Sequence, residues 1–405
     1  MDDCFEIKKC EVCNSTELTP VLDLGAHPLC DDLVPVKNSA ICEKSPIEIL
    51  YCTKCDTAHQ RYQVPKIKLF PQTYHYRSRF TADVLLGMQA LTDSVEKNKG
   101  SLVGLKVLDV GCNDGSLLDK FSAKGAITIG IEPTGAYADA EGRGHVIYND
   151  FFSAVSARKI LDTQGRIDLI TFTNVFAHIE DLPGLLLALK SIMNEDTTLV
   201  VENHYLGAVL GKNQFDTFYH EHPRTYSLHS FVHIAKSLGR EVVDVEFPHR
   251  YGGNIRVIIG KTGTRSLEIS DLIASILKKE VEFLDQFRSM NSFMVKWKKD
   301  KKEQINQLVS KMGKLKAKAF PGRAAILVEL LGLSAEQIDC VYEKPGSLKI
   351  GHYLPGTRIP IRSDDDLFEN INQSSVLLNL AWHIPVEIDA YLRQNGYKGE
   401  IVNIV

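Results

Sequence analysis

The sequence predicts an α/β protein in three parts: a small cysteine-rich domain, a central α/β domain and a second α/β domain at the C-terminus. Seven of the nine cysteines lie within the first 55 residues. Around residue 110, an apolar run, a glycine-rich turn and a helical pattern follow one another. Beyond residue 323, strand-like and helix-like runs alternate. We expect the three domains to span residues 1–65, 66–265 and 266–405.

The composition is that of a soluble globular protein. The chain has 405 residues, of which 44% are hydrophobic and 24% charged, and its formal net charge is −4. A nucleic-acid partner usually requires a strong basic excess, which this chain lacks. No apolar run approaches the roughly 18 residues of a membrane helix, and the acidic start MDDCFEIKKCEVC has no apolar signal region. We therefore expect a cytoplasmic monomer with no nucleic-acid or membrane partner.

The N-terminal domain contains two CxxC pairs. Cys10 and Cys13 belong to CEVC, and Cys52 and Cys55 belong to CTKC. Two such pairs supply the four thiolates of a tetrahedral zinc site, and the loop between them can be long. A redox pair usually occurs singly, whereas here two pairs bracket one segment. The sequence therefore predicts a structural zinc site that is closed to substrate.

The central domain begins with a strand, a glycine-rich loop and a helix. In LKVLDVGCNDGSLL (105–118) the glycines at 111 and 115 allow the backbone to approach a ligand closely. A second apolar run ends at Glu132, about 20 residues further on, where an acidic side chain can bind ribose hydroxyls. The polar and aromatic stretch YNDFF (148–152) suits an adenine. Together these features predict a nucleoside pocket.

This pocket resembles that of the class I S-adenosylmethionine-dependent methyltransferases, which have a Rossmann-like fold. The competing interpretation is a dinucleotide dehydrogenase, but its G-x-G-x-x-G fingerprint is absent, because C-N-D-G follows Gly111. IDLITFTNVFAHIEDL (167–182) carries further polar residues at the carboxyl end of a strand, where ligands bind. The resemblance implies that S-adenosylmethionine is bound by Asp109, Gly111, Cys112, Asn113, Gly115, Glu132, Asp150, Phe151 and Asn174.

The stretch FYHEHPRTYS (218–227) concentrates ionisable side chains. Its two histidines are two residues apart and Pro223 follows at once, so a helical zinc site is not expected. A strand could still direct His220 and His222 to the same side, which leaves a metal site open. A proton-transfer site and a polar loop are the alternatives.

Several motifs together resemble the sugar C-methyltransferases, which act on nucleotide-linked 4-keto-6-deoxy sugars. The resemblance runs from about residue 8 to the end of the chain. One departure lies at 316–333, where a basic lead and a proline-glycine pair replace the glycine-alanine-rich turn of the family. The motifs are the CxxC pairs, YHYRS (74–78), NVFAHIED, FYHEHPRTYS, RYGGNIRV (250–257) and YLPGTRIPI (353–361).

The resemblance implies a role for each catalytic candidate. His222 would remove the proton beside the sugar ketone, at C3, since an imidazole is a suitable base at neutral pH. Tyr219 and Glu221 would bind and polarise the sugar, with Tyr76 and His178 in the same pocket. An O-methyltransferase acting on a sugar hydroxyl is the alternative activity, and a non-enzymatic zinc scaffold is a third possibility. We expect His220, Arg224 and Tyr226 to be structural.

The segment 266–318 differs from the rest of the chain in its residue pattern and composition. Apolar residues recur at helical spacing in its first part, and its second part is rich in lysine. We expect a solvated pair of helices that links the central domain to the C-terminal domain, although the lysines could also attract a diphosphate.

Overall fold

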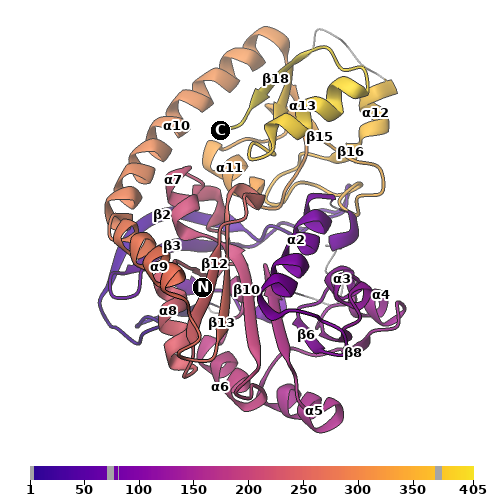
Figure 1. Cartoon of the computed structure of the whole chain (residues 1–405). Helices are drawn as coiled ribbons and strands as arrows, with labels where there is room; N and C mark the ends of the chain where they lie inside the picture. Colours follow the sequence, from indigo (N-terminus) through magenta and orange to yellow (C-terminus); the bar gives the residue numbers. More distant parts are fainter. Residues whose placement is uncertain (1–3, 71–76, 81, 370–375) are drawn as a thin grey trace.

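The computed structural model describes residues 4–70, 77–80, 82–369 and 376–405. In this part of the chain there are three sheets of four or more strands, and a two-stranded ribbon formed by β1 (Phe5–Glu6) and β5 (Tyr62–Gln63). Figure 1 shows the N-terminal sheet beside the long helix α10 (Phe283–Met312), which rises from the central domain to the C-terminal domain.

The N-terminal sheet contains one strand from the middle of the chain. Its four antiparallel strands lie in the order β11-β4-β3-β2. The strand β11 is the end of the histidine-rich stretch predicted above, so that stretch is built into the cysteine-rich domain. The bounds are β2 (Leu18–Pro28), β3 (Lys44–Cys52), β4 (Thr57–Gln60) and β11 (Arg224–Thr225).

The central sheet has seven strands, in the order β12-β13-β10-β9-β6-β7-β8. Strands β8, β7, β6, β9 and β10 are parallel, and β13 is antiparallel to both of its neighbours. This is a Rossmann-like order with a hairpin added at one edge. The bounds are β6 (Lys106–Val110), β7 (Ile127–Ile131), β8 (Val146–Tyr148), β9 (Leu169–Thr173), β10 (Thr198–His204), β12 (Glu241–Glu246) and β13 (Asn254–Gly260).

Helices cover both faces of this sheet. Neighbouring residues of a strand point to opposite faces, and on β6 the side chain of Val107 packs in one hydrophobic cluster and that of Leu108 in another. Burial on both faces explains the continuous apolar runs of the parallel strands. The helices are α1 (Lys66–Leu69), α2 (Ala82–Lys99), α3 (Ser116–Ala123), α4 (Tyr137–Glu141), α5 (Ala154–Gln164), α6 (Leu182–Ile192), α7 (Leu206–Gly211) and α8 (Leu228–Ser237), with 3₁₀ turns η1 (Ser78–Phe80), η2 (Phe176–His178), η3 (Phe215–Thr217) and η4 (Arg250–Gly252).

The C-terminal sheet has five parallel strands in the order β16-β15-β14-β17-β18. The order reverses between β14 and β17, which is where open α/β sheets leave a crevice at the carboxyl ends of the strands. The bounds are β14 (Leu315–Lys318), α11 (Ala324–Leu331), β15 (Ile338–Glu343), β16 (Ile361–Ser363), α12 (Asp364–Glu369), β17 (Val376–Asn379), α13 (Pro385–Gln394) and β18 (Glu400–Asn403).

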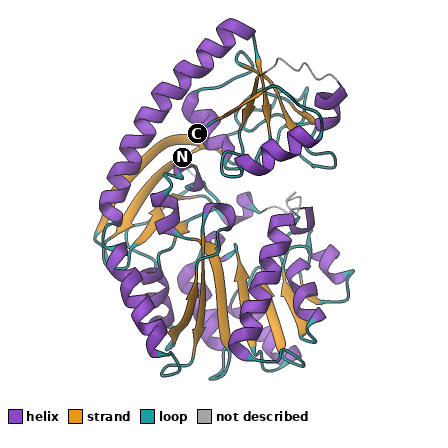
Figure 2. Ribbon diagram, turned by 45° about the horizontal axis from the view of Figure 1, so that its top comes forward, coloured by secondary structure: helices purple, strands orange, loops and turns teal. Residues whose placement is uncertain are grey.

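The segment 266–318 forms two helices, α9 (Leu267–Glu280) and α10, but α10 is more than a solvated connection. Its buried residues are Phe283, Phe287, Met290, Met294, Trp297 and Ile305. They pack in one hydrophobic cluster with residues of β2, β3 and the C-terminal sheet, and the indole of Trp297 donates to the carbonyl of Ile404 at 2.8 Å. The apolar face of α10 therefore holds two domains together. Figure 2 shows the long helix lying beside the N-terminal strands and reaching the C-terminal domain. None of the described helices is long and apolar enough to cross a membrane.

Candidate active site and zinc site

The four predicted cysteines lie together. The sulfur atoms of Cys10 and Cys55 are 3.4 Å apart, those of Cys13 and Cys52 are 3.6 Å apart, and all four sulfurs lie within 4.8 Å of one another. A tetrahedral zinc ion with bonds of about 2.3 Å places its sulfur ligands about 3.8 Å apart. This donor set fits zinc. Among the described residues it is the one group of three or more potential metal ligands close enough to share an ion.

The glycine loop forms a narrow turn at the carboxyl end of β6. Gly111 and Gly115 have φ angles of +71° and +78°. A Cβ atom at Gly111 would lie 2.6 Å from a methyl group of Val175, and one at Gly115 would lie 2.9 Å from the Cβ of Ala140. Only glycine therefore fits both the backbone conformation and the space, and the resulting cradle fits the predicted nucleoside ligand.

Glu132 fastens the glycine loop to the strand beside it. Its carboxylate accepts a hydrogen bond from the backbone N–H of Asn113 at 3.0 Å, and others from the N–H and hydroxyl of Thr134 at 2.9 and 2.6 Å. Each carboxylate oxygen has two lone pairs, so further acceptor capacity remains. Asp150 is exposed just after β8, and the ammonium group of Lys66 lies 4.6 Å from the ring centre of Phe151.

The remaining predicted cofactor residues occupy different positions. Asp109 is buried in the sheet, where its carboxylate accepts from the Thr171 hydroxyl at 2.7 Å, and burial raises its pKa to about 7. The thiol of Cys112 is also buried and packs in a hydrophobic cluster, so it is the backbone of this residue, not its side chain, that belongs to the loop. Asn174 directly follows β9, with φ of +55°. Its side-chain oxygen accepts a hydrogen bond from the side-chain amide of Asn254 at 3.3 Å.

Histidines from three separate segments meet beside this pocket. The ring centre of His222 lies 5.0 Å from that of His178 and 5.2 Å from that of His204. The ring of Tyr219 is 4.2 Å from that of His222, and Phe70 stacks on the far side of His178 at 5.2 Å. The structure thus brings together three of the predicted catalytic residues, His222, His178 and Tyr219.

The tautomer of His222 follows from its hydrogen bond. Its Nδ1 atom lies 3.1 Å from the carbonyl oxygen of Thr217. A carbonyl can only accept, so Nδ1 carries the hydrogen and, in a neutral ring, Nε2 keeps its lone pair. Burial, reinforced by the neighbouring His178 and His204, holds the pKa of His222 well below its usual value. The ring is therefore neutral at pH 7, with Nε2 able to take up a proton.

The neighbouring histidines are neutral as well. Burial lowers the pKa of His178 to about 4. Burial, followed by the charge of Arg323, lowers that of His204 to about 3. A neutral imidazole can donate one hydrogen bond and accept another, so the cluster offers both functions to a ligand without bringing in a positive charge.

His220, in the same stretch, points elsewhere. The Nε2 atom of His220 donates to the carbonyl of Ser45 at 3.0 Å, so His220 faces the N-terminal sheet while His222 faces the cluster. The two side chains do not converge, which removes the geometric basis for a metal site made from this pair. Glu221 is buried, and Tyr76 lies outside the described residues.

His204 and Glu202 were not predicted, although a signal existed. Both lie at the carboxyl end of β10, the same kind of position that identified Asn174. Glu202 is fully buried, and its carboxylate accepts from Asn254 at 3.1 Å and from Arg256 at 2.8 Å. A second charged group of the motif RYGGNIRV, Arg250, also lies 3.4 Å from Glu202, so three residues of this motif contact β10.

The C-terminal domain contacts the central domain beside the cluster through Arg323. This residue lies in the predicted departure segment, and its guanidinium donates to both carboxylate oxygens of Asp216, at 2.8 and 2.6 Å. The indole of Trp382 donates to the same carboxylate at 2.9 Å. The positive charge of Arg323 also contributes to lowering the pKa of His204 and of His383, for which burial is the main cause.

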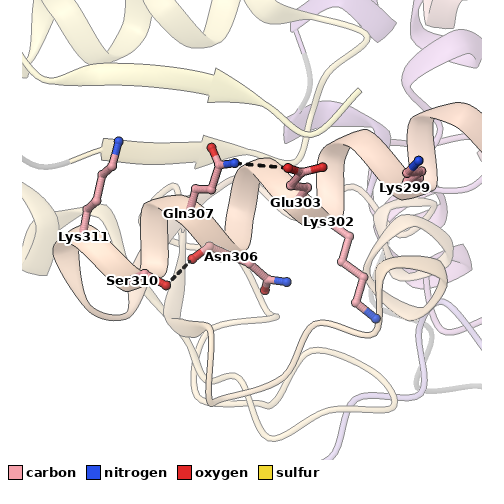
Figure 3. Close-up of a pocket in the computed structure, with 7 residues that line it drawn as sticks. All are labelled: Lys299, Lys302, Glu303, Asn306, Gln307, Ser310 and Lys311. Carbon is pink, nitrogen blue, oxygen red and sulfur yellow. Dashed lines mark hydrogen bonds between the residues drawn. The ribbon is translucent and has the colours of Figure 1, made fainter.

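A surface hollow along α10 lies away from this chemistry. It is lined by Lys299, Lys302, Glu303, Asn306, Gln307, Ser310 and Lys311, all exposed residues of α10 (Figure 3). Side chains from one helix face do not converge on a bound molecule. The histidine cluster draws on several elements and carries the perturbed pKa values expected of a functional site, which makes it the candidate active site.

Comparisons with known proteins bear on the domains of the chain. The chain matches three family models in succession, described as "Putative zinc binding domain" (10–70), "Methyltransferase domain" (75–245) and "C-methyltransferase C-terminal domain" (249–403). It is 28% identical over 388 residues to the C-methyltransferase NovU of Streptomyces niveus, covering 94% of this chain and 91% of that protein.

More distant matches cover the chain in part. A ubiquinone biosynthesis O-methyltransferase of Rhodopseudomonas palustris is 30% identical over 27% of this chain and 43% of its own length. Among solved structures, the magnesium protoporphyrin IX methyltransferase of Synechocystis with bound SAH is 18% identical, with a TM-score of 0.35, over 44% of this chain and 86% of that one. With three successive matches in this order and four cysteines that fit zinc, the chain is an S-adenosylmethionine-dependent methyltransferase that is similar over most of its length to a C-methyltransferase.

Proposed function

We propose that this enzyme methylates C3 of a nucleotide-linked 4-keto-6-deoxy sugar, with His222 as the general base. The observation that carries the proposal is the neutral ring of His222, whose Nδ1–H donates to Thr217 and whose Nε2 is left as a proton acceptor. The match to a C-methyltransferase over 94% of the chain supports carbon as the methylated atom.

The chemistry requires a carbanion equivalent at the sugar carbon. S-adenosylmethionine supplies an electrophilic methyl group. Nε2 of His222 takes the proton from the carbon beside the ketone, and the electrons of that C–H bond move toward the ketone oxygen. Tyr219 and His178 lie against His222, where a hydroxyl or a neutral imidazole N–H can stabilise the charge on that oxygen. Glu221 and Tyr76 complete the proposed sugar site.

The methyl donor is proposed to lie on the glycine loop, above the carboxyl ends of the parallel strands. Glu132 would bind the ribose with the remaining lone pair of its Oε2 atom. The other proposed contacts are the loop 109–115, the adenine position at Asp150 and Phe151, and Asn174 at the end of β9. The boundaries at residues 65 and 265 are proposed as the limits of the three domains.

We propose that the protein works as a monomer in a reducing compartment, the cytoplasm. All nine cysteines are free thiols, and a zinc site made of four thiolates requires reduced cysteines.

The test is incubation of the enzyme with candidate nucleotide 4-ketosugars, followed by mass spectrometry and NMR of the product. The expected result is a new methyl group on the carbon beside the ketone. In D₂O without the methyl donor, the same position should exchange its proton for deuterium. A methyl group on oxygen would instead establish the O-methyltransferase alternative, and an unmodified sugar would exclude this substrate class.

A further inference from the structure

Arg224 is a fully buried cation that joins three segments of the chain. Its guanidinium donates to the carboxylate of Glu11 at 2.5 Å, to the hydroxyl of Tyr226 at 3.0 Å, and to the carbonyl of Glu180 at 3.3 and 3.4 Å. A buried guanidinium is costly unless its donors are satisfied. Here all three nitrogens of the planar fork donate, to three separate acceptors, and the single ammonium nitrogen of a lysine cannot reproduce that geometry.

Two of these contacts, and Arg224 itself, lie close in sequence to a site residue. Glu11 stands between Cys10 and Cys13 in the first zinc knuckle, where Gln63 also donates to it at 2.8 Å. Glu180 follows His178 by two residues, and Arg224 follows His222 by two residues. The same guanidinium therefore connects the zinc knuckle to both segments that carry the stacked histidines.

The His222 segment is held to the N-terminal domain along its length. The backbone N–H of Gln60 donates to the carbonyl of Pro223 at 2.8 Å, and its side chain donates to the carbonyl of Tyr219 at 3.2 Å. Further along, the hydroxyls of Ser227 and Ser230 donate to the carbonyl of Cys55 at 3.4 and 3.2 Å. Both zinc knuckles thus contact the stretch that begins at Tyr219.

We propose that Arg224, anchored by Glu11, is a positioning residue that fixes the rings of His222 and His178 relative to each other. The inference rests on the proposed role of His222. The two ring centres are 5.0 Å apart, and a displacement of about 1 Å at a reacting group can cost on the order of 100-fold in rate. The zinc knuckle is then part of the scaffold of the active site as well as a folding element.

The test compares Glu11→Gln and Arg224→Lys with a control, Glu48→Gln. Glutamine keeps the size of Glu11 and can still accept one hydrogen bond, but it lacks the charge. Glu48 forms an ion pair with Arg61 at 2.6 Å in the same sheet. Both test variants should keep about one zinc per chain and bind S-adenosylmethionine within about threefold of wild type, because the glycine loop is not involved. Their kcat and their deuterium exchange into the substrate should fall roughly 10- to 100-fold, while the control stays within twofold.

A purely structural role would lower the melting temperature without changing kcat per zinc-loaded molecule. A kcat within twofold of wild type in both test variants would overturn the proposal. Failure of Glu11→Gln to fold would overturn it too, since the pair would then be structural.

Backbone hydrogen exchange supplies a readout that does not depend on the sugar chemistry. In Glu11→Gln, peptides covering 176–182 and 219–226 should exchange faster than in wild type. Unchanged protection of both peptides would refute the positioning role, even if the proposed function holds. If wild-type enzyme does not exchange the substrate proton, the base assignment fails, and the peptide protection still decides the positioning role.

Discussion

Replacing His222 by asparagine removes the proposed base with little other change. The asparagine amide nitrogen takes a position close to that of Nδ1 in histidine. It can still donate to the carbonyl of Thr217, the 3.1 Å bond that fixes the ring. What disappears is the lone pair of Nε2. The substitution therefore separates proton transfer from local structure more cleanly than alanine, which would also leave the carbonyl without its donor.

The size of the effect follows from the chemistry. A positioned general base contributes about 10²- to 10⁴-fold to turnover, which corresponds to about 2.7–5.4 kcal/mol in the activation free energy. We expect kcat of His222→Asn to fall by this factor, and deuterium exchange beside the ketone to stop. Calorimetry should show S-adenosylmethionine binding within threefold of wild type, because the glycine loop lies on other elements.

The matched control is His220→Gln. The glutamine amide nitrogen reaches the position of Nε2, so the hydrogen bond to the carbonyl of Ser45 is kept, and activity should stay near wild type. If His222→Asn retains kcat within tenfold of wild type, His222 is not the base. His178 and Tyr219, the nearest neighbours of its ring, would then be the next candidates.

The pH profile checks the same assignment. Burial lowers the pKa of His222 below its usual value, so the basic form persists into acid, and the acid limb of kcat/KM should fall below the ordinary histidine value of about 6.5. The unfolded chain, in contrast, protonates its histidines near that value. The stability that the neutral rings contribute is complete above the pKa of histidine in the unfolded chain. It is lost as the pH falls from that value toward the lower pKa of the folded protein. A limb at or above pH 7 would contradict the neutral cluster.

Three further predictions concern other parts of the molecule. Cys10→Ser should reduce zinc from about one ion per chain to well below that in metal analysis, and an unchanged content would place the metal elsewhere. Glu132→Gln should weaken S-adenosylmethionine binding by about 1.5–3 kcal/mol, the range for hydrogen bonds to a charged group, and wild-type affinity in calorimetry would remove this residue from the site. Lys318→Met leaves the buried carboxylate of Asp364 without its partner at 2.8 Å, and should lower the free energy of unfolding by about 3–5 kcal/mol. In the same denaturant titrations, Lys316→Met, on the same face of that strand but with a partly exposed side chain, should change it by only about 0.5 kcal/mol, and equal effects would contradict the reasoning.

The features that could be predicted from the sequence are those that depend on residues close together in the chain. Each zinc knuckle needs only a CxxC spacing, and the glycine loop needs a strand, a turn and a helix within 14 residues (105–118). The carboxyl ends of parallel strands meet at one edge of the sheet, so Glu132 could be assigned to the pocket from its place after a strand alone.

The features that could not be predicted depend on contacts between distant segments. Nothing near Arg323 indicates that it will bind Asp216, because the two meet only when α11 docks on the central domain. Lysines alternate with the apolar residues of α10 in the sequence, so its buried stripe was not recognised from the sequence. Likewise, a dipeptide such as Arg224–Thr225 has no strand signal of its own, and it forms a strand only because it pairs with the edge of β4.

The late pairing of β11 with the edge of β4 has a consequence for the synthesis of the protein. Gln60 on β4 and Tyr219, which it binds, are 159 residues apart, so the ribosome must synthesise most of the central domain before β11 can cover β4. Until then the N-terminal domain, the first part of the chain to be made, presents an unpaired strand edge, a surface prone to pairing with other chains. The histidine-bearing segment is therefore also the protecting strand of that sheet. Any variant that detaches it should aggregate during synthesis more readily than it loses cofactor binding, and a yield that depends on expression temperature would be its first sign.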